Sequence, residues 1–278
     1  MKYAFNTWVY GSFPVWVPSY TLDETIKRIA AAGYDGIEIG CAAPHAWPAH
    51  LSAERRKDIK VLLEGENLTP VSLLPAPGGG PGNNPSSPLR EERQATMAHY
   101  KEVVDLAADL GAKLVMYIGG WQVFGTSRKD AWAWSVEGLR EVAQHAKSRG
   151  ITVVAEPTSA DSNVIETADD ALELIQASGQ DNVGVMFDTY HALYRSEVSA
   201  DYVRTMREHL VHVHASDTDR LPPGEGAVDW VSLMQALKDA DYQGYVTMEI
   251  GFNTRAAEPD RYARQALSYL KRVEQQLT

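Results

Sequence analysis

The sequence is poor in cysteine, in basic residues and in long apolar runs. Cys41 is the only cysteine among the 278 residues, which excludes an intrachain disulfide and a cysteine-based zinc cluster. The 26 lysines and arginines stand against 37 acidic residues, and the resulting net charge of -11 argues against binding of a nucleic-acid backbone. No apolar run reaches membrane-spanning length, and the N-terminus lacks the apolar core of a signal peptide. We therefore expect a cytoplasmic protein that binds neither nucleic acid nor a membrane.

Short β-forming runs alternate with helical patterns from one end of the chain to the other. The predicted strands cover residues 3–6, 36–40, 69–74, 113–118, 151–156, 183–188, 210–215 and 245–250. The predicted helices cover residues 21–32, 52–65, 89–110, 129–149, 167–177, 231–240 and 259–274. The strands have nearly continuous apolar cores, which is typical of parallel strands covered on both faces.

This alternation predicts an α/β protein, a single (β/α)8 TIM barrel that spans residues 1–278 as one domain. A doubly wound open sheet is the competing α/β architecture. The number of strands favours the barrel, and so does the lack of a glycine-rich dinucleotide-binding turn after the first strand.

Acidic residues and a histidine stand at the carboxyl ends of the predicted strands, where a barrel has its active site. Glu156, Asp188 and Glu249 each follow an apolar run directly, and a carboxylate in such a place is costly unless it is paired or bound to a metal. With His214 they offer three oxygens and one nitrogen, a set that suits Mn²⁺, Mg²⁺ or Co²⁺ better than a structural zinc. The alternative is that each acid forms a separate ion pair or caps a helix.

At these residues the sequence resembles the sugar isomerase and epimerase barrels related to xylose isomerase and endonuclease IV, most closely the ketose 3-epimerase branch. The motifs that carry the resemblance are YDGIEIG at 34–40, EP at 156–157, MFDTYH at 186–191, HVHASDTDR at 212–220, PGEG at 223–226 and VTME at 246–249. The stretches PHAW at 44–47 and EPDRYARQAL at 258–267 are similar to fructoselysine 3-epimerases.

The resemblance implies a metal site and a pair of catalytic residues. Glu156, Asp188, His214 and Glu249 would bind one divalent metal ion, which we expect to be Mn²⁺, with Mg²⁺ or Co²⁺ as alternatives. Glu156 and Glu249 would also exchange protons with C3 of the substrate from opposite faces.

The resemblance also implies substrate-binding residues. His191 and Arg220 would contact the sugar oxygens beside the metal, and Glu38 would lie near the pocket. Asp161 is the counterpart of a carboxylate that contacts the substrate in this family, although it is shorter than the usual glutamate and one residue closer to Glu156.

Tryptophans and one loop are further candidates on the active face. Trp121 is predicted to contact the substrate and, with Trp8, Trp16 and Trp47, to form an apolar wall for a side group of the substrate. Packing beneath loops is the alternative for each. The proline- and glycine-rich loop 75–88 is interpreted either as a lid or as an inert surface loop.

The residue types fit C3 epimerisation of a ketose or ketosyl-amine. A metal that binds a ketone and a neighbouring hydroxyl acidifies the carbon-bound hydrogen and stabilises the enediolate. One glutamate then removes the proton, and the other returns one to the opposite face. The expected partner is therefore a small-molecule sugar, and the resemblance suggests a homo-oligomer, either a dimer or a tetramer.

Three other functions are alternatives. A lyase or dehydratase of the same superfamily would act by β-elimination on a keto-sugar, an inosose or a 3-keto-glycoside, with the same base and metal. A DNA-repair endonuclease would need more histidine and aspartate ligands and a basic groove. A non-catalytic sugar-binding barrel is disfavoured because Glu156 and Glu249 are both present.

Overall fold

The fold is a closed barrel of eight parallel strands, seen in a computed structural model that describes residues 1–11, 19–75, 82–252 and 258–277. Each strand pairs with the next along the chain, and the first strand also pairs with the last. The strands are β1 (Lys2–Asn6), β2 (Gly36–Cys41), β3 (Thr69–Pro75), β4 (Leu114–Ile118), β5 (Thr152–Glu156), β6 (Val183–Asp188), β7 (Leu210–Ala215) and β8 (Tyr245–Met248). The prediction of a single (β/α)8 TIM barrel is confirmed, and the open sheet is excluded.

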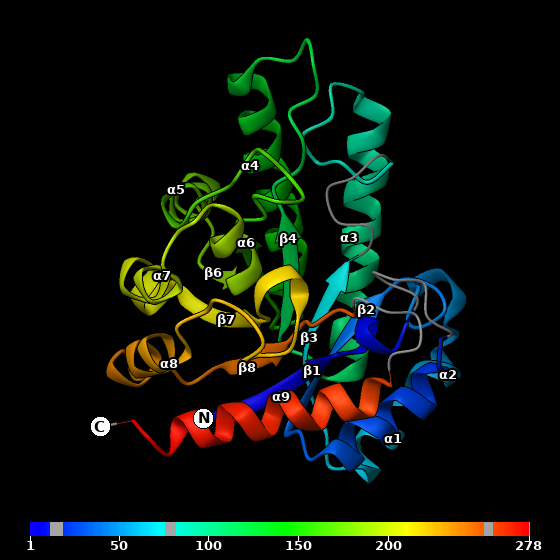
Figure 1. The fold of residues 1–278 in the computed structure, drawn as a ribbon. Helices are drawn as coiled ribbons and strands as arrows, with labels where there is room; N and C mark the ends of the chain where they lie inside the picture. The colour runs from blue at the N-terminus through cyan, green and yellow to red at the C-terminus, as the bar shows by residue number, and fades with distance from the viewer. Residues whose placement is uncertain (12–18, 76–81, 253–257, 278) are drawn as a thin grey trace.

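Helices surround the strands on all sides (Figure 1). They are α1 (Leu22–Ala32), α2 (Ala53–Gly65), α3 (Arg90–Leu110), α4 (Arg128–Lys147), α5 (Ala168–Ser178), α6 (Thr189–Tyr194), α7 (Ser199–Met206), α8 (Trp230–Asp239) and α9 (Pro259–Glu274). Local signals set several helix ends: the Thr21 side chain accepts a hydrogen bond from the Glu24 N–H at the start of α1, and Gly33 ends this helix in the left-handed conformation. Within the described segments no helix has both the length and the apolar character needed to cross a bilayer.

The structure differs from the predicted elements after β6 and at the end of β8. The two short helices α6 and α7 were not among the predicted ranges, because six- and eight-residue helices are too short to show a clear helical period. Strand β8 ends at Met248 rather than at residue 250, so Glu249 lies just beyond the strand. Its N–H still donates to the carbonyl of Ala215.

The interior of the barrel is divided into an apolar and a polar half. Leu74, Met116, Val154 and Met186, from β3 to β6, form a buried cluster separate from the core between strands and helices. On a strand, residues two apart share a face, so these side chains point to the same side as the polar residues at the strand ends. Opposite this cluster, β1, β2 and β7 contribute buried polar side chains, namely Asn6, Glu38, His212 and His214.

Trp8 closes the mouth of the barrel next to β2. It is half-buried and packs against the apolar cluster inside the barrel. A Cβ atom added at Gly40 would lie 1.9 Å from Nε1 of Trp8, so the indole ring occupies the space that any other residue would need. Gly40 is therefore required by packing rather than by its backbone conformation.

We expect Gly40→Ala to lower the free energy of unfolding by about 1–3 kcal/mol, because the new methyl group forces Trp8 out of its position. Urea denaturation of the purified variant measures this. Gly65→Ala, at the end of α2, is the matched control: nothing lies within 4 Å of its added Cβ, and alanine should be neutral or slightly stabilising in a helix. Equal stabilities of the two variants would contradict the packing argument.

Candidate active site

Four strand-end side chains converge at the carboxyl end of the barrel, where they were expected. Glu156 ends β5, Asp188 ends β6, His214 lies in β7 and Glu249 follows β8. The Nδ1 atom of His214 lies 3.3 Å from Oε2 of Glu249 and 3.6 Å from Oε1 of Glu156. Potential ligand atoms of Asp188, His214 and Glu249 all lie within 4.8 Å of one another. The structure thus brings all four predicted metal ligands together.

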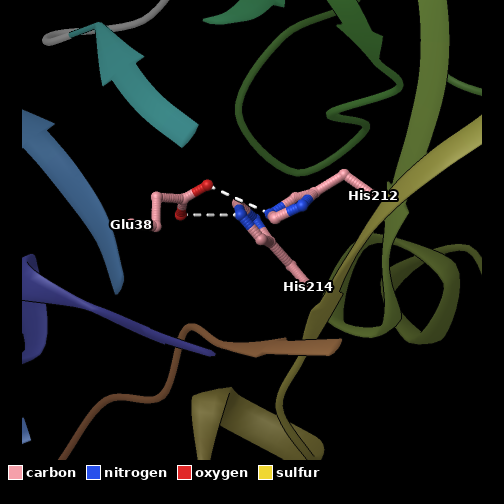
Figure 2. A group of neighbouring side chains, drawn as sticks. All are labelled: Glu38, His212 and His214. Atoms are coloured by element: carbon pink, nitrogen blue, oxygen red, sulfur yellow. Dashed lines mark ion pairs between the residues drawn. The ribbon is translucent and has the colours of Figure 1, made fainter. Parts of the chain in front are cut away.

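Glu38 lies buried inside the barrel, and its predicted contact with the substrate stays a prediction. It is fully buried on β2, and its carboxylate faces two histidines of β7 (Figure 2). Oε1 lies 2.8 Å from Nε2 of His214, and Oε2 lies 3.1 Å from Nε2 of His212. Burial raises the pKa of Glu38, but the combined effect of His214 and His212 outweighs it and holds the pKa well below its usual range.

Arg220 provides the positive charge at the mouth of the site. Its Nη1 atom contacts the carboxylates of both Asp188 and Glu249, and its guanidinium group lies over the ring of Tyr190, 4.3 Å from the ring centre. Stacking on an aromatic ring holds the planar guanidinium group in a fixed orientation. Arg220 is thus positioned from two sides beside the predicted metal ligands.

A strained turn after β7 places Arg220 beside Asp188 and Glu249. Asp219 and Arg220 both have positive φ values, 55° and 65°, in the left-handed region that residues with a Cβ rarely adopt. The buried carboxylate of Asp217 fixes the loop around them by accepting hydrogen bonds from four donors. These are the N–H groups of Thr218, Gly224 and Val228 and the indole N–H of Trp230.

His191 is a neutral hydrogen-bond donor at the edge of the site. The N–H of Ala160 donates to its Nδ1 atom at 3.2 Å, so the ring proton is on Nε2. Burial and the nearby Arg220 lower the pKa of His191 to about 3, which keeps the ring uncharged. Its Nε2 atom lies 3.6 Å from Asp161, whose side chain is 61% exposed and is also 4.0 Å from Arg220. These three residues form one rim of the site.

The two carboxylates proposed as acid and base have different electrostatic environments. Burial raises the pKa of Glu156 to about 7, and the negative charges of Glu249 and Asp188 add to the increase. Burial also acts on Glu249, but Arg220 and His214 outweigh it and lower its pKa to about 2. Burial raises the pKa of Asp188 to about 6. A pair of carboxyl groups whose pKa values are driven apart is typical of acid–base sites.

The site fits a divalent cation. Neither nitrogen of the buried His214 ring makes a hydrogen bond of good geometry with the described residues. Nε2 faces Glu38, whereas Nδ1 faces Glu156 and Glu249. Several carboxylates enclosed with one arginine leave negative charge that a bound cation would compensate. Carboxylate oxygens with one imidazole nitrogen suit a hard or borderline ion.

The predicted tryptophans take different positions. Trp47 stacks on His99 of α3, with the ring centres 4.7 Å apart. Trp8 lies at the barrel mouth, as described above, and Trp121 is half-buried in the loop after β4. Trp16 lies outside the described residues, so the apolar wall stays a prediction.

The described part of the loop 75–88 is anchored rather than free. Residues 76–81 lie outside the described segments, but residues 83–87 are buried. The side-chain amide of Asn84 donates to the carbonyl of Trp121 at 2.9 Å, and its Oδ1 accepts from the Trp121 N–H at 2.9 Å. Ser86 donates to the carbonyl of Gly119. Residues 83–87 therefore pack against the loop that carries Trp121, and the interpretation of the loop 75–88 as a lid stays a prediction.

The profile of the family described as "Xylose isomerase-like TIM barrel" matches residues 26–273. The chain belongs to this family. Its relatives include fructoselysine 3-epimerase of Shigella flexneri, 28% identical over 88% of this chain and 91% of the relative. D-psicose 3-epimerase of Ruminiclostridium cellulolyticum is 30% identical over 81% of this chain and 76% of the relative. The crystal structure of D-psicose 3-epimerase with D-tagatose from Clostridium cellulolyticum superimposes with a TM-score of 0.85 at 24% identity, covering 98% and 99% of the two chains.

Other relatives are named for different reactions. A 3-dehydro-D-guloside 4-epimerase of Escherichia coli is 26% identical over 89% of this chain and 93% of the relative. An inosose dehydratase of Clostridium perfringens is 22% identical over 95% and 94%. The sequence relatives of this xylose isomerase-like barrel therefore include epimerases and a dehydratase.

Three polar residues inside this xylose isomerase-like barrel were not among the predicted site residues. Asn6, Ser72 and His212 all contact the carboxylate of Glu38. His212 could have been found, because it lies two residues before His214 on the same strand and shares its face. Asn6 and Ser72 carry no such signal, because they gain their role only from the register of β1, β2 and β3.

We expect Asp219→Ala to lower the free energy of unfolding by about 1–2 kcal/mol relative to Asp219→Gly, because alanine resists the left-handed conformation. The comparison isolates the backbone effect, since neither variant keeps the carboxylate. Chemical denaturation of both variants measures it. Indistinguishable stabilities would show that the turn relaxes at no cost and that Arg220 does not depend on a strained backbone.

Proposed function

We propose that this chain is a divalent-metal-dependent sugar epimerase that inverts C3 of a ketose or a ketosyl-amine. The observation that carries the proposal is the approach of Glu156 and Glu249 to the Nδ1 atom of His214 from two different strands. Two carboxyl groups in one enclosed site supply both the base and the acid that an inversion at carbon needs. The relatives named as fructoselysine and D-psicose 3-epimerases support this choice of reaction.

Glu156, Asp188, His214 and Glu249 would hold the metal ion, for which we propose Mn²⁺, with Mg²⁺ or Co²⁺ as alternatives. When bound, the ion would polarise the ketone and offset the negative charge that develops when the neighbouring C–H bond breaks.

The two glutamates would exchange protons with C3. The carboxylate on one side takes the C3 proton, and the electron pair of the C–H bond moves toward the ketone oxygen to form the enediolate. The carboxylic acid on the other side then donates its proton to the opposite face of C3, which restores the ketone and inverts the centre. Each glutamate ends in the protonation state from which the reverse reaction starts, so neither oxidant nor reductant is needed.

The rim residues would bind and orient the sugar. His191 offers an N–H on Nε2 and no charge, which suits a hydrogen bond to a sugar oxygen. Arg220 offers a fixed positive charge next to Glu249. The exposed carboxylate of Asp161, within 4.0 Å of Arg220, would accept a hydrogen bond from a substrate hydroxyl. Trp121 is the proposed apolar contact.

The second candidate is a lyase of the same superfamily. The inosose dehydratase among the relatives favours it, because the same base and metal can remove a proton before a β-substituent leaves.

A homo-oligomer and a cytoplasmic location stay predictions.

In D₂O, the Mg²⁺-loaded protein should incorporate deuterium at C3 of its substrate and form the C3 epimer, because the proton passes through a carboxyl group that exchanges with solvent. Proton NMR on a panel of fructose, psicose, tagatose and a fructosamine tests this. Glu156→Gln and Glu249→Gln should each lose epimerisation by at least about 100-fold. Glu173→Gln, an exposed substitution on α5, is the control.

The variants also separate the two candidate functions. Exchange without inversion in one glutamine variant would identify the remaining glutamate as the base for that face. Epimerisation at the wild-type rate in either glutamine variant would exclude the two-glutamate mechanism. Loss of a substituent from the substrate would favour the lyase, and exchange at a different carbon would favour a 4-epimerase.

Removal of divalent metal with a chelator should abolish turnover and lower the melting temperature. A ligand at 100 times its dissociation constant stabilises the folded state by about 2.7 kcal/mol, so added Mn²⁺ should restore both properties. Asp188→Asn should remove the stabilisation by Mn²⁺, whereas Asp169→Asn, exposed on α5, should leave it intact. Differential scanning fluorimetry with and without Mn²⁺ measures this. Equal metal-dependent shifts in the two variants would contradict the proposed ligand set.

A further inference from the structure

The carboxylate of Glu38 contacts four polar side chains inside the barrel. Asn6 Nδ2 donates to Oε1 at 2.7 Å, and the hydroxyl of Ser72 donates to Oε2 at 2.6 Å. Both neighbours stand directly beside Glu38 in the strand register, Asn6 on β1 and Ser72 on β3. Because Asn6 and Ser72 bond to the carboxylate from either side, they hold it in one orientation independently of its contacts with β7.

Across the barrel, this carboxylate meets two histidines of the same strand. His212 and His214 are two residues apart on β7, so both rings point inward, with their centres 5.2 Å apart and their planes at 78°. Each ring presents Nε2 to a different oxygen of Glu38, as the dashed lines in Figure 2 show. His212 therefore occupies Oε2 and leaves Oε1 for His214.

The contact with Glu38 decides which nitrogen of His214 carries the ring proton. Nε2 lies 2.8 Å from a carboxylate oxygen, and a lone pair on that nitrogen would be repelled at this distance, so Nε2 bears the proton. Nδ1, on the opposite side of the ring, faces Glu249 and Glu156 and is therefore the nitrogen left to bind a cation held by these carboxylates. A carboxylate that fixes the tautomer and orientation of a histidine in this way makes the ring a better metal ligand.

We infer that Glu38 is a positioning residue, which holds the His214 ring with a proton on Nε2 and leaves Nδ1 as the nitrogen that would bind a metal ion among the carboxylates of the site. The inference rests on the proposed function in so far as it assigns His214 to the metal. It is an alternative to the expected substrate contact of Glu38, because the described residues already occupy both oxygens. Asn6, Ser72 and His212 support Glu38 in this role.

Glu38, His212 and His214 could instead form a second metal site, since their ligand atoms lie within 4.8 Å of one another. The arrangement argues against it. Both oxygens of Glu38 already accept a hydrogen bond from Asn6 or Ser72, and a metal between Glu38 and His214 would require the loss of the Nε2 proton.

The ring protonation of His214 tests the inference directly. In ¹⁵N-labelled protein, long-range ¹H–¹⁵N correlation spectra should show His214 protonated on Nε2, both without metal and with Mg²⁺ bound. A proton on Nδ1 alone in the wild-type protein would overturn the inference without any variant, so the test does not depend on the folding of a mutant. His214→Gln supplies the assignment of the resonances.

Glu38→Gln tests the consequence for the metal. The glutamine amide has the size of the carboxylate but presents an N–H₂ group as well as an oxygen, so it no longer enforces protonation on Nε2. We expect Mn²⁺ affinity, measured by titration calorimetry, to fall by about 10- to 100-fold, and excess Mn²⁺ to restore occupancy. Ser72→Ala should cause a smaller loss, because Ser72 contacts the oxygen that faces away from His214.

Three outcomes decide between the possibilities. A folded Glu38→Gln protein with wild-type Mn²⁺ affinity and an unchanged His214 tautomer would overturn the inference. Two metal ions per wild-type chain, of which the variant loses one, would also overturn it in favour of a second metal site. Failure of the proposed function is distinguishable: no ketose would be turned over, while the His214 tautomer and its dependence on Glu38 would still be observed.

Discussion

Enclosed negative charge is the constraint on which the rest of this site depends. Four carboxylates from different strands, those of Glu38, Glu156, Asp188 and Glu249, share the end of one barrel. Burying an ionised carboxylate without a partner costs several kcal/mol, so the positive groups among them are as necessary to the fold as to any chemistry. Arg220 compensates two of the carboxylates, and the His214 ring stands between the other two.

Closure of the barrel allows His214 to contact Glu38 on one edge of its ring and Glu156 and Glu249 on the other. Glu38 on β2 and His214 on β7 are far apart in the sequence and are not neighbours in the sheet. Their side chains meet because an eight-stranded barrel is narrow enough for inward-facing residues to touch across its axis. The deeper Glu38 contacts one edge of the ring, and the strand-end glutamates face the other edge. The ring thus connects the interior of the barrel to its mouth.

Much of the fold and the metal-ligand candidates could be predicted from the sequence, because both have a local signature. An apolar run followed by an acid marks the end of a buried strand, as at Glu156 and Asp188, and the carboxyl ends of parallel strands meet at one face. The contacts of Asn6 and Ser72 could not be predicted in this way, because a polar residue within a strand becomes informative only when the register with the next strand is known. The strained turn before Arg220 was also hidden, since neither Asp219 nor Arg220 is a glycine that would mark positive φ.

The two halves of the barrel interior explain why equivalent carboxyl groups differ. Glu156 stands two residues beyond Val154 of the apolar cluster, and burial raises its pKa although the neighbouring His214 acts in the opposite direction. Glu249 emerges next to Arg220 and His214, on the polar side, and its pKa is lowered. A symmetric interior would give both groups similar proton affinities, and a proton could then not be held preferentially on one of them. The unlike surroundings of Glu156 and Glu249 therefore favour a proton on Glu156 while Glu249 stays ionised, which is a state from which the proposed proton transfer can start.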